Sequence, residues 1–264
     1  VQTPERRAFL PLVMQPDEPG PDRRFAVQIY STANAQVAKA AEAGIGRVRI
    51  PLSWAAIEPL NTDPEGYRWS PAFEEGLARI ALNKMDLILT IEGNPYWAAT
   101  YPTGPIDKTP IGEFVEFVVA AVRRYSAPPY NVKLWEFYNE PDNGDEQWAV
   151  NSGLGYWGND PEAYADMLAA VYGPIKQVDP EAQVLIGGLC FDFWEEDGGP
   201  FIKDFLDRVL EHGGGEYFDV LNFHYYPTAF GHKWNPYGPG LIGKSTFLRD
   251  KLAAYGLHKP VICT

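Results

Sequence analysis

The chain alternates between short apolar runs and longer amphipathic segments from about residue 25 onward. The segments between the apolar runs repeat apolar residues at three- and four-residue steps, and several begin at Ser, Thr or Asp and end at Gly, as helices do. The apolar runs themselves are rich in β-branched and aromatic residues and predict seven strands, at 25–30, 47–53, 86–92, 132–139, 183–189, 219–226 and 260–264. Regular alternation of strand and helix predicts a parallel sheet covered by helices.

The connections indicate which edge of this sheet carries function. Joins from helix to strand are short, whereas long, aromatic-rich segments follow the third, fourth and sixth strands. Elaboration at the carboxyl ends of strands is typical of barrel enzymes and also of doubly wound open sheets. No Gly-rich nucleotide loop follows any strand, so we expect a (β/α)8 TIM barrel. We expect it to be incomplete, because an eighth strand and helix are not found in the sequence.

The same pattern predicts the domain organisation. Residues 1–23 are Pro-rich and charged around one apolar patch, and we interpret them as a lead-in segment. Residues 24–264 are expected to form the barrel.

Charge and composition exclude several partners. The net charge is −13, from 35 acidic and 22 basic side chains, so nucleic acid and anionic membrane surfaces would be repelled. No run is long and apolar enough to span a membrane. Eight Trp and fifteen Tyr suit a surface that stacks on sugar rings, although a core of large side chains has the same composition. Cys190 and Cys263 are expected to be buried thiols, and neither a metal nor a cofactor is expected.

The segment from Trp135 to Asp142 carries the strongest chemical signal. The fourth predicted strand ends in Asn139-Glu140, and Pro141 breaks it at once, so Glu140 lies at the mouth of the predicted barrel. A carboxyl among aromatic residues and beside a second acid suits a general acid, because desolvation and like charge favour the protonated form. A single strand-end Glu is as readily a solvated surface acid, so the interpretation depends on what accompanies it.

Other strand ends complete a wider pattern. Its parts are Arg49, Ser53-Trp54, Ile57-Glu58-Pro59, Tyr67-Arg68-Trp69-Ser70, Pro95-Tyr96-Trp97-Ala98 and the run from Asn222 to Pro227. Together with the segment around Glu140, this series resembles the clan A retaining glycoside hydrolases, especially β-xylosidases, iduronidases and cellulase-like barrels. The resemblance extends from about residue 25 to the last residue, and it is specific for the clan rather than for a substrate.

The resemblance implies roles for individual residues. Glu140 would be the acid/base of a double displacement, and Asn139 would hydrogen-bond the sugar 2-hydroxyl. Arg49 would lie beneath the catalytic carboxylates and keep the nucleophile ionised. Alternatively it forms a structural ion pair with Glu136, and both can hold.

Two residues of the sixth strand receive roles in the same way. His224 would lean toward the acid/base, and Tyr226 would donate to the nucleophile. Period-two alternation places the two on one side of their strand. A His in a barrel strand is otherwise most often a core residue, so this role depends on the resemblance.

Aromatic residues at strand ends are candidates for sugar binding. Six tryptophans are considered, Trp54, Trp97, Trp148, Trp157, Trp194 and Trp234. About half are expected to be stacking platforms, with Trp97 favoured, and the others to pack loops. The candidate substrate-binding tryptophans are Trp54, Trp97, Trp148, Trp157 and Trp234. Glu92 also ends a strand and is a candidate subsite acid, at a position where the cellulase branch often has a His.

The expected nucleophile is not found in the sequence. In clan A it is a Glu that closes the seventh strand, which here runs from Lys259 to Thr264, so we expect it at the next position. A retaining mechanism needs two carboxyls roughly 5 Å apart. Three explanations are open: a fragment of a longer hydrolase, an eighth strand formed by the patch from Ala8 to Met14 despite Pro11, or a natural barrel that binds sugar without turnover.

The favoured hypothesis is a retaining hydrolase of β-linked poly- or oligosaccharides that is inactive over these 264 residues alone. The alternative is a non-catalytic carbohydrate-binding barrel. A metal-dependent sugar isomerase or amidohydrolase is disfavoured, because the strand ends offer no His/Asp cluster. A polysaccharide substrate and an acidic, cysteine-poor chain fit secretion, although a cytosolic oligosaccharide hydrolase would have the same features. The sequence predicts neither the sugar nor the oligomeric state.

Overall fold

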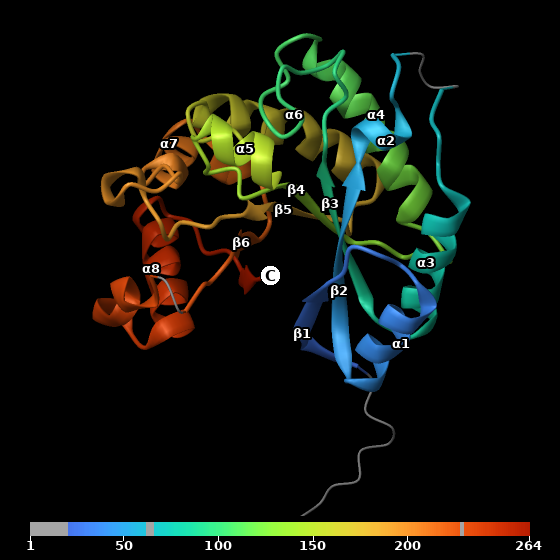
Figure 1. The fold of residues 1–264 in the computed structure, drawn as a ribbon, viewed down its shortest axis with the longest axis horizontal. Helices are drawn as coiled ribbons and strands as arrows, with labels where there is room; N and C mark the ends of the chain where they lie inside the picture. The colour runs from blue at the N-terminus through green and yellow to red at the C-terminus, as the bar shows by residue number, and fades with distance from the viewer. Residues whose placement is uncertain (1–20, 62–65, 228–229) are drawn as a thin grey trace, which may run out of the picture.

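The computed structural model describes residues 21–61, 66–227 and 230–264 (Figure 1). Over these ranges the strands are β1 (Asp22–Gln28), β2 (Ile45–Ser53), β3 (Asp86–Glu92), β4 (Leu134–Asn139), β5 (Gln183–Gly188), β6 (Leu221–Phe223) and β7 (Val261–Cys263). The α-helices are α1 (Asn34–Glu42), α2 (Trp54–Ile57), α3 (Pro71–Leu82), α4 (Ile111–Tyr125), α5 (Glu146–Ser152), α6 (Pro161–Val178), α7 (Phe205–Glu211) and α8 (Gly240–Ala254). Three short 3₁₀ turns are η1 (Glu195–Asp197), η2 (Gly214–Tyr217) and η3 (Gly231–Tyr237).

The strands form a parallel half-barrel in chain order. Strands β1 to β5 make one parallel sheet, and β6 pairs with β7 in parallel. Two parallel bridges, Leu185 to Val220 and Leu189 to Phe223, connect β5 with the β6 segment. The predicted parallel α/β architecture is thereby confirmed, with an incomplete barrel in the described residues. The patch from Ala8 to Met14, considered for the eighth strand, lies outside the described residues.

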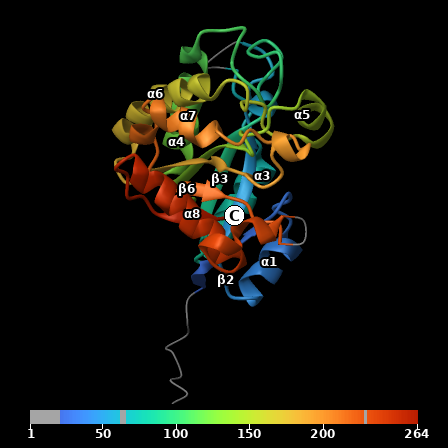
Figure 2. The same ribbon diagram turned by 90° about the vertical axis from the view of Figure 1, so that its left-hand side faces the viewer.

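The helices cover the outer side of the strands, as Figures 1 and 2 show. Helix α4 has a stripe of buried side chains at three- and four-residue steps, formed by Phe114, Phe117, Val118, Ala121, Val122 and Tyr125. This apolar stripe faces the sheet and removes its surface from water, which is the main driving force for such packing. Helix α8 lies beside β6 and β7 near the C-terminal residue (Figure 2).

Two elements differ from the sequence expectations. Strand β6 ends at Phe223 instead of continuing to Tyr226, because residues 224–226 leave the sheet at the mouth of the half-barrel. The prediction that both cysteines are buried was wrong for Cys263, which is exposed, whereas Cys190 is buried; both are free thiols. Cys263 is the last residue of β7, which has β6 as its one strand neighbour in the described sheet.

Strand β4 ends in a sharp turn. Tyr138 and Glu140 have left-handed backbone conformations, with φ of +62° and +50°. Each such conformation costs a residue with a Cβ roughly 1–2 kcal/mol, so the surroundings must hold it. The Glu140 N–H donates to the carbonyl of Gly188 at 3.1 Å, which fixes the turn against β5. Glu140 therefore leaves strand β4 in a defined direction.

Strand β5 ends in glycine where two other segments approach closely. A Cβ on Gly188 would lie 2.3 Å from Nε2 and 2.7 Å from Cδ2 of the His224 ring. A Cβ on Gly187 would lie 2.4 Å from the Phe137 carbonyl oxygen. The last two residues of β5 thus lack side chains because the imidazole and strand β4 occupy that space.

We expect Gly188→Ala to destabilise the fold by about 1–3 kcal/mol, because the new methyl group overlaps the buried His224 ring. Gly112→Ala is the matched control, since nothing lies within 4 Å of a Cβ at this position of α4. That variant should leave stability unchanged or slightly raised. Urea denaturation of both variants measures the difference, and equal stabilities would contradict the packing described.

Candidate active site

A buried ion pair lies at the centre of the half-barrel. The Nε and Nη2 atoms of Arg49 in β2 lie 2.7 Å and 2.8 Å from the two carboxylate oxygens of Glu136 in β4. Glu136 also accepts hydrogen bonds from Thr90 Oγ1 at 2.8 Å, from the backbone N–H of Gly188 at 2.9 Å and from Asn222 Nδ2 at 2.9 Å. Its side chain is fully buried, so the carboxylate exchanges water for five protein donors.

The charges of this pair are stabilised by each other. Burial alone would raise the pKa of Glu136, but the Arg49 guanidinium outweighs it, and the pKa lies below the ordinary value. Burial alone would lower the pKa of Arg49, and Glu136 holds it above the ordinary value. Of the two sequence interpretations of Arg49, the structure forms the ion pair with Glu136. Its action on a nucleophile stays a prediction.

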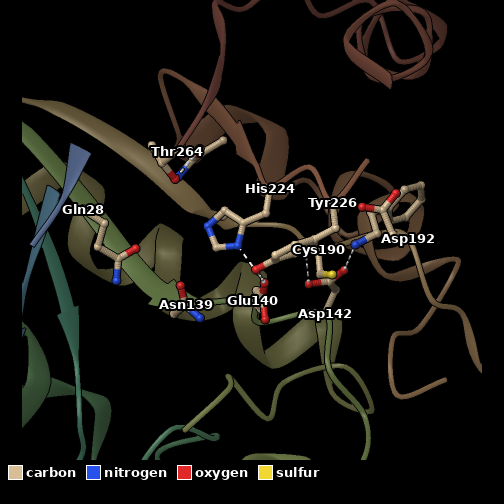
Figure 3. A network of polar contacts seen from close by, with 12 residues as sticks. Gln28, Asn139, Glu140, Asp142, Cys190, Asp192, His224, Tyr226 and Thr264 are labelled. Carbon is tan, nitrogen blue, oxygen red and sulfur yellow. Dashed lines mark hydrogen bonds and ion pairs between the residues drawn. The ribbon is translucent and has the colours of Figure 1, made fainter. Parts of the chain in front are cut away.

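Arg49 also orients two amide side chains. Its Nη1 donates to Gln28 Oε1 at 2.6 Å, and its Nη2 donates to Asn139 Oδ1 at 3.0 Å. A guanidinium can only donate, so both amides turn their oxygen atoms toward it. Their NH₂ groups therefore face away from Arg49 and have no acceptor among the described residues. Asn139 thus presents a donor beside Glu140, as its assigned role requires (Figure 3).

Glu140 is buried and held by two side chains from the segment after β6. Its side chain is 5% exposed. Oε1 lies 2.7 Å from His224 Nδ1 and accepts a hydrogen bond from the Tyr226 hydroxyl at 3.1 Å (Figure 3). The structure thus brings His224 to Glu140, as the resemblance implies. Tyr226 differs from the expectation, because its hydroxyl donates to Glu140 rather than toward the carboxyl end of β7.

A second acid, Asp142, lies close to Glu140. Its two oxygens accept the backbone N–H groups of Cys190 at 3.1 Å and Phe191 at 2.8 Å. Burial, and then the negative charge of Glu140, raise the pKa of Asp142 to about 7, against the two hydrogen bonds, which lower it. Asp142 therefore fixes the loop after β5 against the turn that carries Glu140.

A fully buried lysine supports the same loops from behind. Lys244 of α8 donates to the carbonyl of His224 and to Asp192 Oδ2, both at 2.8 Å, and also to the carbonyl of Cys190. Asp192 accepts in addition from Trp234 Nε1 at 2.7 Å. The lysine thereby ties the segments after β5 and β6 to one helix, so the position of His224 depends on α8.

Glu92 lies at the carboxyl end of β3 and lines a cavity of about 240 Å³. The cavity is also lined by Gln28, Tyr30, Arg49, Pro51, Thr90, Asn139, Ser152 and Gly153. Burial, and then the charge of Glu136, raise the pKa of Glu92 to about 7 against the opposing effect of Arg49. The cavity lies where the ends of β1 to β4 meet the end of α5, next to Asn139.

The tryptophans divide into buried and accessible side chains. Trp54, Trp157 and Trp234 are at most 1% exposed, so they have no free face for a sugar ring, and their assignment as platforms is corrected to packing. Trp97 is partly buried, packs edge-on against Trp54 and donates from Nε1 to the Glu58 carbonyl at 3.2 Å. Trp148 of α5 is 45% exposed and retains an accessible ring.

Trp194 is also partly buried, and ammonium groups cover its ring. Lys233 Nζ lies 3.6 Å and Lys203 Nζ 4.8 Å from the ring centroid. This is a cation–π arrangement, in which the ring binds side chains of the protein itself. Trp194 therefore packs its loop in this structure.

Sequence reasoning gave no role to several polar residues of the network. They are Gln28, Thr90, Asp192 and Lys244, and also Asn222, which entered only as part of a motif. Gln28, Thr90 and Asn222 share a detectable feature, because each is one polar residue within an apolar strand. Such a residue points either to water or to the barrel axis, and β-strand alternation decides between the two. Lys244 has no comparable signal, because nothing in the α8 sequence marks it as buried.

In the part of the chain that the structure describes, no group of three or more His, Cys, Asp or Glu residues is arranged to hold a metal ion. No helix of residues 21–61, 66–227 and 230–264 combines the length and the apolar character needed to cross a bilayer.

Glu136→Gln should destabilise the protein by about 3–5 kcal/mol, because it leaves the Arg49 guanidinium buried without its counter-charge. Glu181→Gln is the control, since Glu181 is 82% exposed in its pair with Lys133 and should change stability by less than about 0.5 kcal/mol. Chemical denaturation at pH 7 measures both. A loss below about 1 kcal/mol for Glu136→Gln would refute the central role of the ion pair.

The raised pKa of Glu92 makes the free energy of unfolding decrease as the pH rises. Its pKa rises from 4.5 to about 7 on folding, so between these values the folded protein binds more protons than the unfolded chain. Stability is therefore lost as the pH rises through about 7. Glu92→Gln should match the native protein at pH 5 and exceed it at pH 8.5 by on the order of 2 kcal/mol, after allowance for solvent screening. Thermal melts at both pH values test this, and a constant difference would contradict it.

A search of curated proteins found no match. The model of the cellulase family, glycosyl hydrolase family 5, matches residues 20–256. This range contains Arg49, Asn139, Glu140, His224 and Tyr226.

Solved structures share the fold. A glucosidase from Croceicoccus marinus is 19% identical with a TM-score of 0.60, over 89% of this chain and 48% of that one. A family 39 glycoside hydrolase from Bacteroides cellulosilyticus WH2 is 20% identical with a TM-score of 0.54, over 77% of this chain and 39% of that one. An endo-1,4-β-mannanase from Rhizomucor miehei is 16% identical with a TM-score of 0.57, over 90% and 76%.

The chain thus spans less than half the length of the glucosidase and of the family 39 enzyme. At these identities the structures show a common barrel fold. The family match extends over most of the sequence and confirms the resemblance to clan A glycoside hydrolases. The chain belongs to the cellulase family, glycosyl hydrolase family 5.

Proposed function

We propose that this protein is a retaining hydrolase of β-linked poly- or oligosaccharides, with Glu140 as its acid/base. The observation that carries the proposal is the environment of the Glu140 carboxyl. His224 and Tyr226 both contact Oε1, and no described residue hydrogen-bonds Oε2. One oxygen is thus held by the protein, and the other is available to exchange a proton with a glycosidic oxygen.

The proposed reaction has two displacement steps. In the first, Glu140 protonates the glycosidic oxygen while a carboxylate attacks the anomeric carbon, so the bond to the leaving sugar breaks and a glycosyl–enzyme ester forms. In the second, Glu140 removes a proton from water, which attacks the same carbon and releases the carboxylate. Two inversions give net retention. The Asn139 amide donates to a sugar hydroxyl, and this contact strengthens in the transition state.

The attacking carboxylate is proposed at the carboxyl end of β7, at the position that follows Thr264. Thr264 Oγ1 lies 3.0 Å from Asn222 Nδ2, and the same amide nitrogen donates to Glu136. The end of β7 is thus connected to the Arg49–Glu136 pair. A carboxylate beside this network would be kept ionised by Arg49, as a nucleophile requires.

Support for the substrate class comes from the family and from accessible aromatic rings. The solved structures of similar fold include a glucosidase and an endo-1,4-β-mannanase. Tyr30, Tyr96 and Trp148 are 82%, 72% and 45% exposed, and each follows the end of β1, β3 or β4. Exposed rings at this edge suit stacking on a sugar chain that passes over the mouth. A polymeric substrate and an acidic surface also fit action outside the cell.

Aryl β-glycosides with azide as an external nucleophile test the two carboxyl roles separately. We expect the 264-residue chain to cleave dinitrophenyl β-glucosides or β-mannosides in the presence of azide. Glu140→Gln should retain this rate but lose about 100-fold or more on phenyl glycosides, whose poorer leaving group needs protonation. Glu146→Gln removes a nearby exposed acid and serves as the control.

The stereochemistry of the azide product decides the position of the nucleophile. An α-glycosyl azide means that azide attacked the substrate directly, as expected when the nucleophile lies after Thr264. A β-glycosyl azide means that a carboxylate of these residues formed the intermediate, which would overturn the position after Thr264. Equal losses for Glu140→Gln on both leaving groups would overturn the acid/base assignment.

A further inference from the structure

The cavity beside Asn139 has an uneven distribution of donors and acceptors. Its cation, Arg49, uses Nε, Nη1 and Nη2 in hydrogen bonds to Glu136, Gln28 and Asn139. The two amides turn their NH₂ groups away from Arg49. One charged group of the lining remains without a hydrogen bond from the described residues, and this is the carboxyl of Glu92.

An unsatisfied, partly buried carboxyl in such a cavity requires a ligand donor or water. Glu92 lines the same cavity as Gln28 and Asn139. The volume of this cavity, about 240 Å³, is of the order of one sugar unit. A ring in this cavity would meet two amide donors and one carboxyl acceptor. Sugar hydroxyls both donate and accept, so they satisfy all three groups.

We propose that Glu92 selects the charge of the glycosyl unit bound in this cavity: it accepts hydroxyl hydrogens of an uncharged sugar and excludes a uronic acid. This inference rests on the proposed function and adds a specificity determinant to it. A carboxylate on the sugar would meet the Glu92 carboxylate at short range. It would find no free guanidinium in return, because Arg49 is already paired with Glu136.

The exclusion of a uronic acid should become stronger as the pH rises. The raised pKa of Glu92, about 7, makes the side chain neutral at pH 5.5 and ionised at pH 8.5. Repulsion of a uronate is therefore weak at the lower pH and strong at the higher. The other charged groups facing Glu92 are Arg49 from β2 and Glu136 from β4, and the phenol of Tyr30 lies after β1. The pKa of Arg49 is raised and that of Glu136 is lowered, so both keep their charges over this range.

The experiment compares ligands that differ only at C6. Phenyl 1-thio-β-glucoside and phenyl 1-thio-β-glucuronide resist hydrolysis, and the corresponding mannose pair covers the second sugar class. Calorimetric titration of the 264-residue protein gives the affinity ratio of neutral to acidic ligand at pH 5.5 and 8.5. We expect a ratio about tenfold larger at pH 8.5 than at pH 5.5. In Glu92→Gln the ratio should be the same at both pH values.

Glu146→Gln is the matched control, because it removes the same charge from the exposed surface of α5 without lining the cavity. It should retain the pH-dependent ratio of the native protein. A ratio that is independent of pH in the native protein, or one that Glu92→Gln leaves unchanged, would overturn the role of Glu92 while leaving the proposed function intact. If neither neutral ligand binds at any pH, the sugar site and thus the proposed function fail together with this inference.

Discussion

The buried carboxylate of Glu136 connects the strands of this half-barrel through hydrogen bonds. Glu136 in β4 receives hydrogen bonds from Arg49 in β2, Thr90 in β3, Gly188 at the end of β5 and Asn222 in β6. Arg49 extends the network to Gln28 in β1, and Asn222 extends it to Thr264 after β7. Each of the seven described strands, or the residue at its end, is therefore joined to this group. Because the carboxylate is fully buried, the loss of one donor would lower the free energy of unfolding. The hydrogen bonds therefore fix the strand ends relative to one another.

The geometry around Glu140 is built outward from the Glu136 carboxylate. Asn139 is oriented by the guanidinium that the carboxylate holds, and Glu140 follows it in a left-handed turn that places its side chain against His224. The strained turn is held by the hydrogen bond from the Glu140 N–H to the Gly188 carbonyl, and the missing side chain at Gly188 leaves room for the His224 ring. Lys244 then fixes the carbonyl of His224 from the far side. Glu140 is thus positioned by contacts that extend outward from the Arg49–Glu136 ion pair.

The sequence was sufficient for the architecture because alternation, caps and loop lengths are local properties. The seven strands lie where the apolar runs predict them, with β6 shortened to Leu221–Phe223. The pairing of Arg49 with Glu136 is one of the two interpretations that the sequence allows for Arg49, and the structure forms it. Burial of the tryptophans was not predictable in this way, since Trp54 and Trp148 occupy similar places along the chain but differ by packing partners that are distant in sequence. The same holds for Lys244, whose partners come from two other loops.

The two contacts on Oε1 of Glu140 have a consequence for the direction in which a substrate arrives. His224 and Tyr226 both contact Oε1, so under the proposed function a glycosidic oxygen would meet the carboxyl group at Oε2. Under the proposed function, a sugar chain would then lie across the mouth with one particular face of its ring toward β4, and its direction along the protein surface would be set by this contact. Under the same proposal, the ring face presented to Glu140 would be selected by the imidazole and the phenol that hold Oε1.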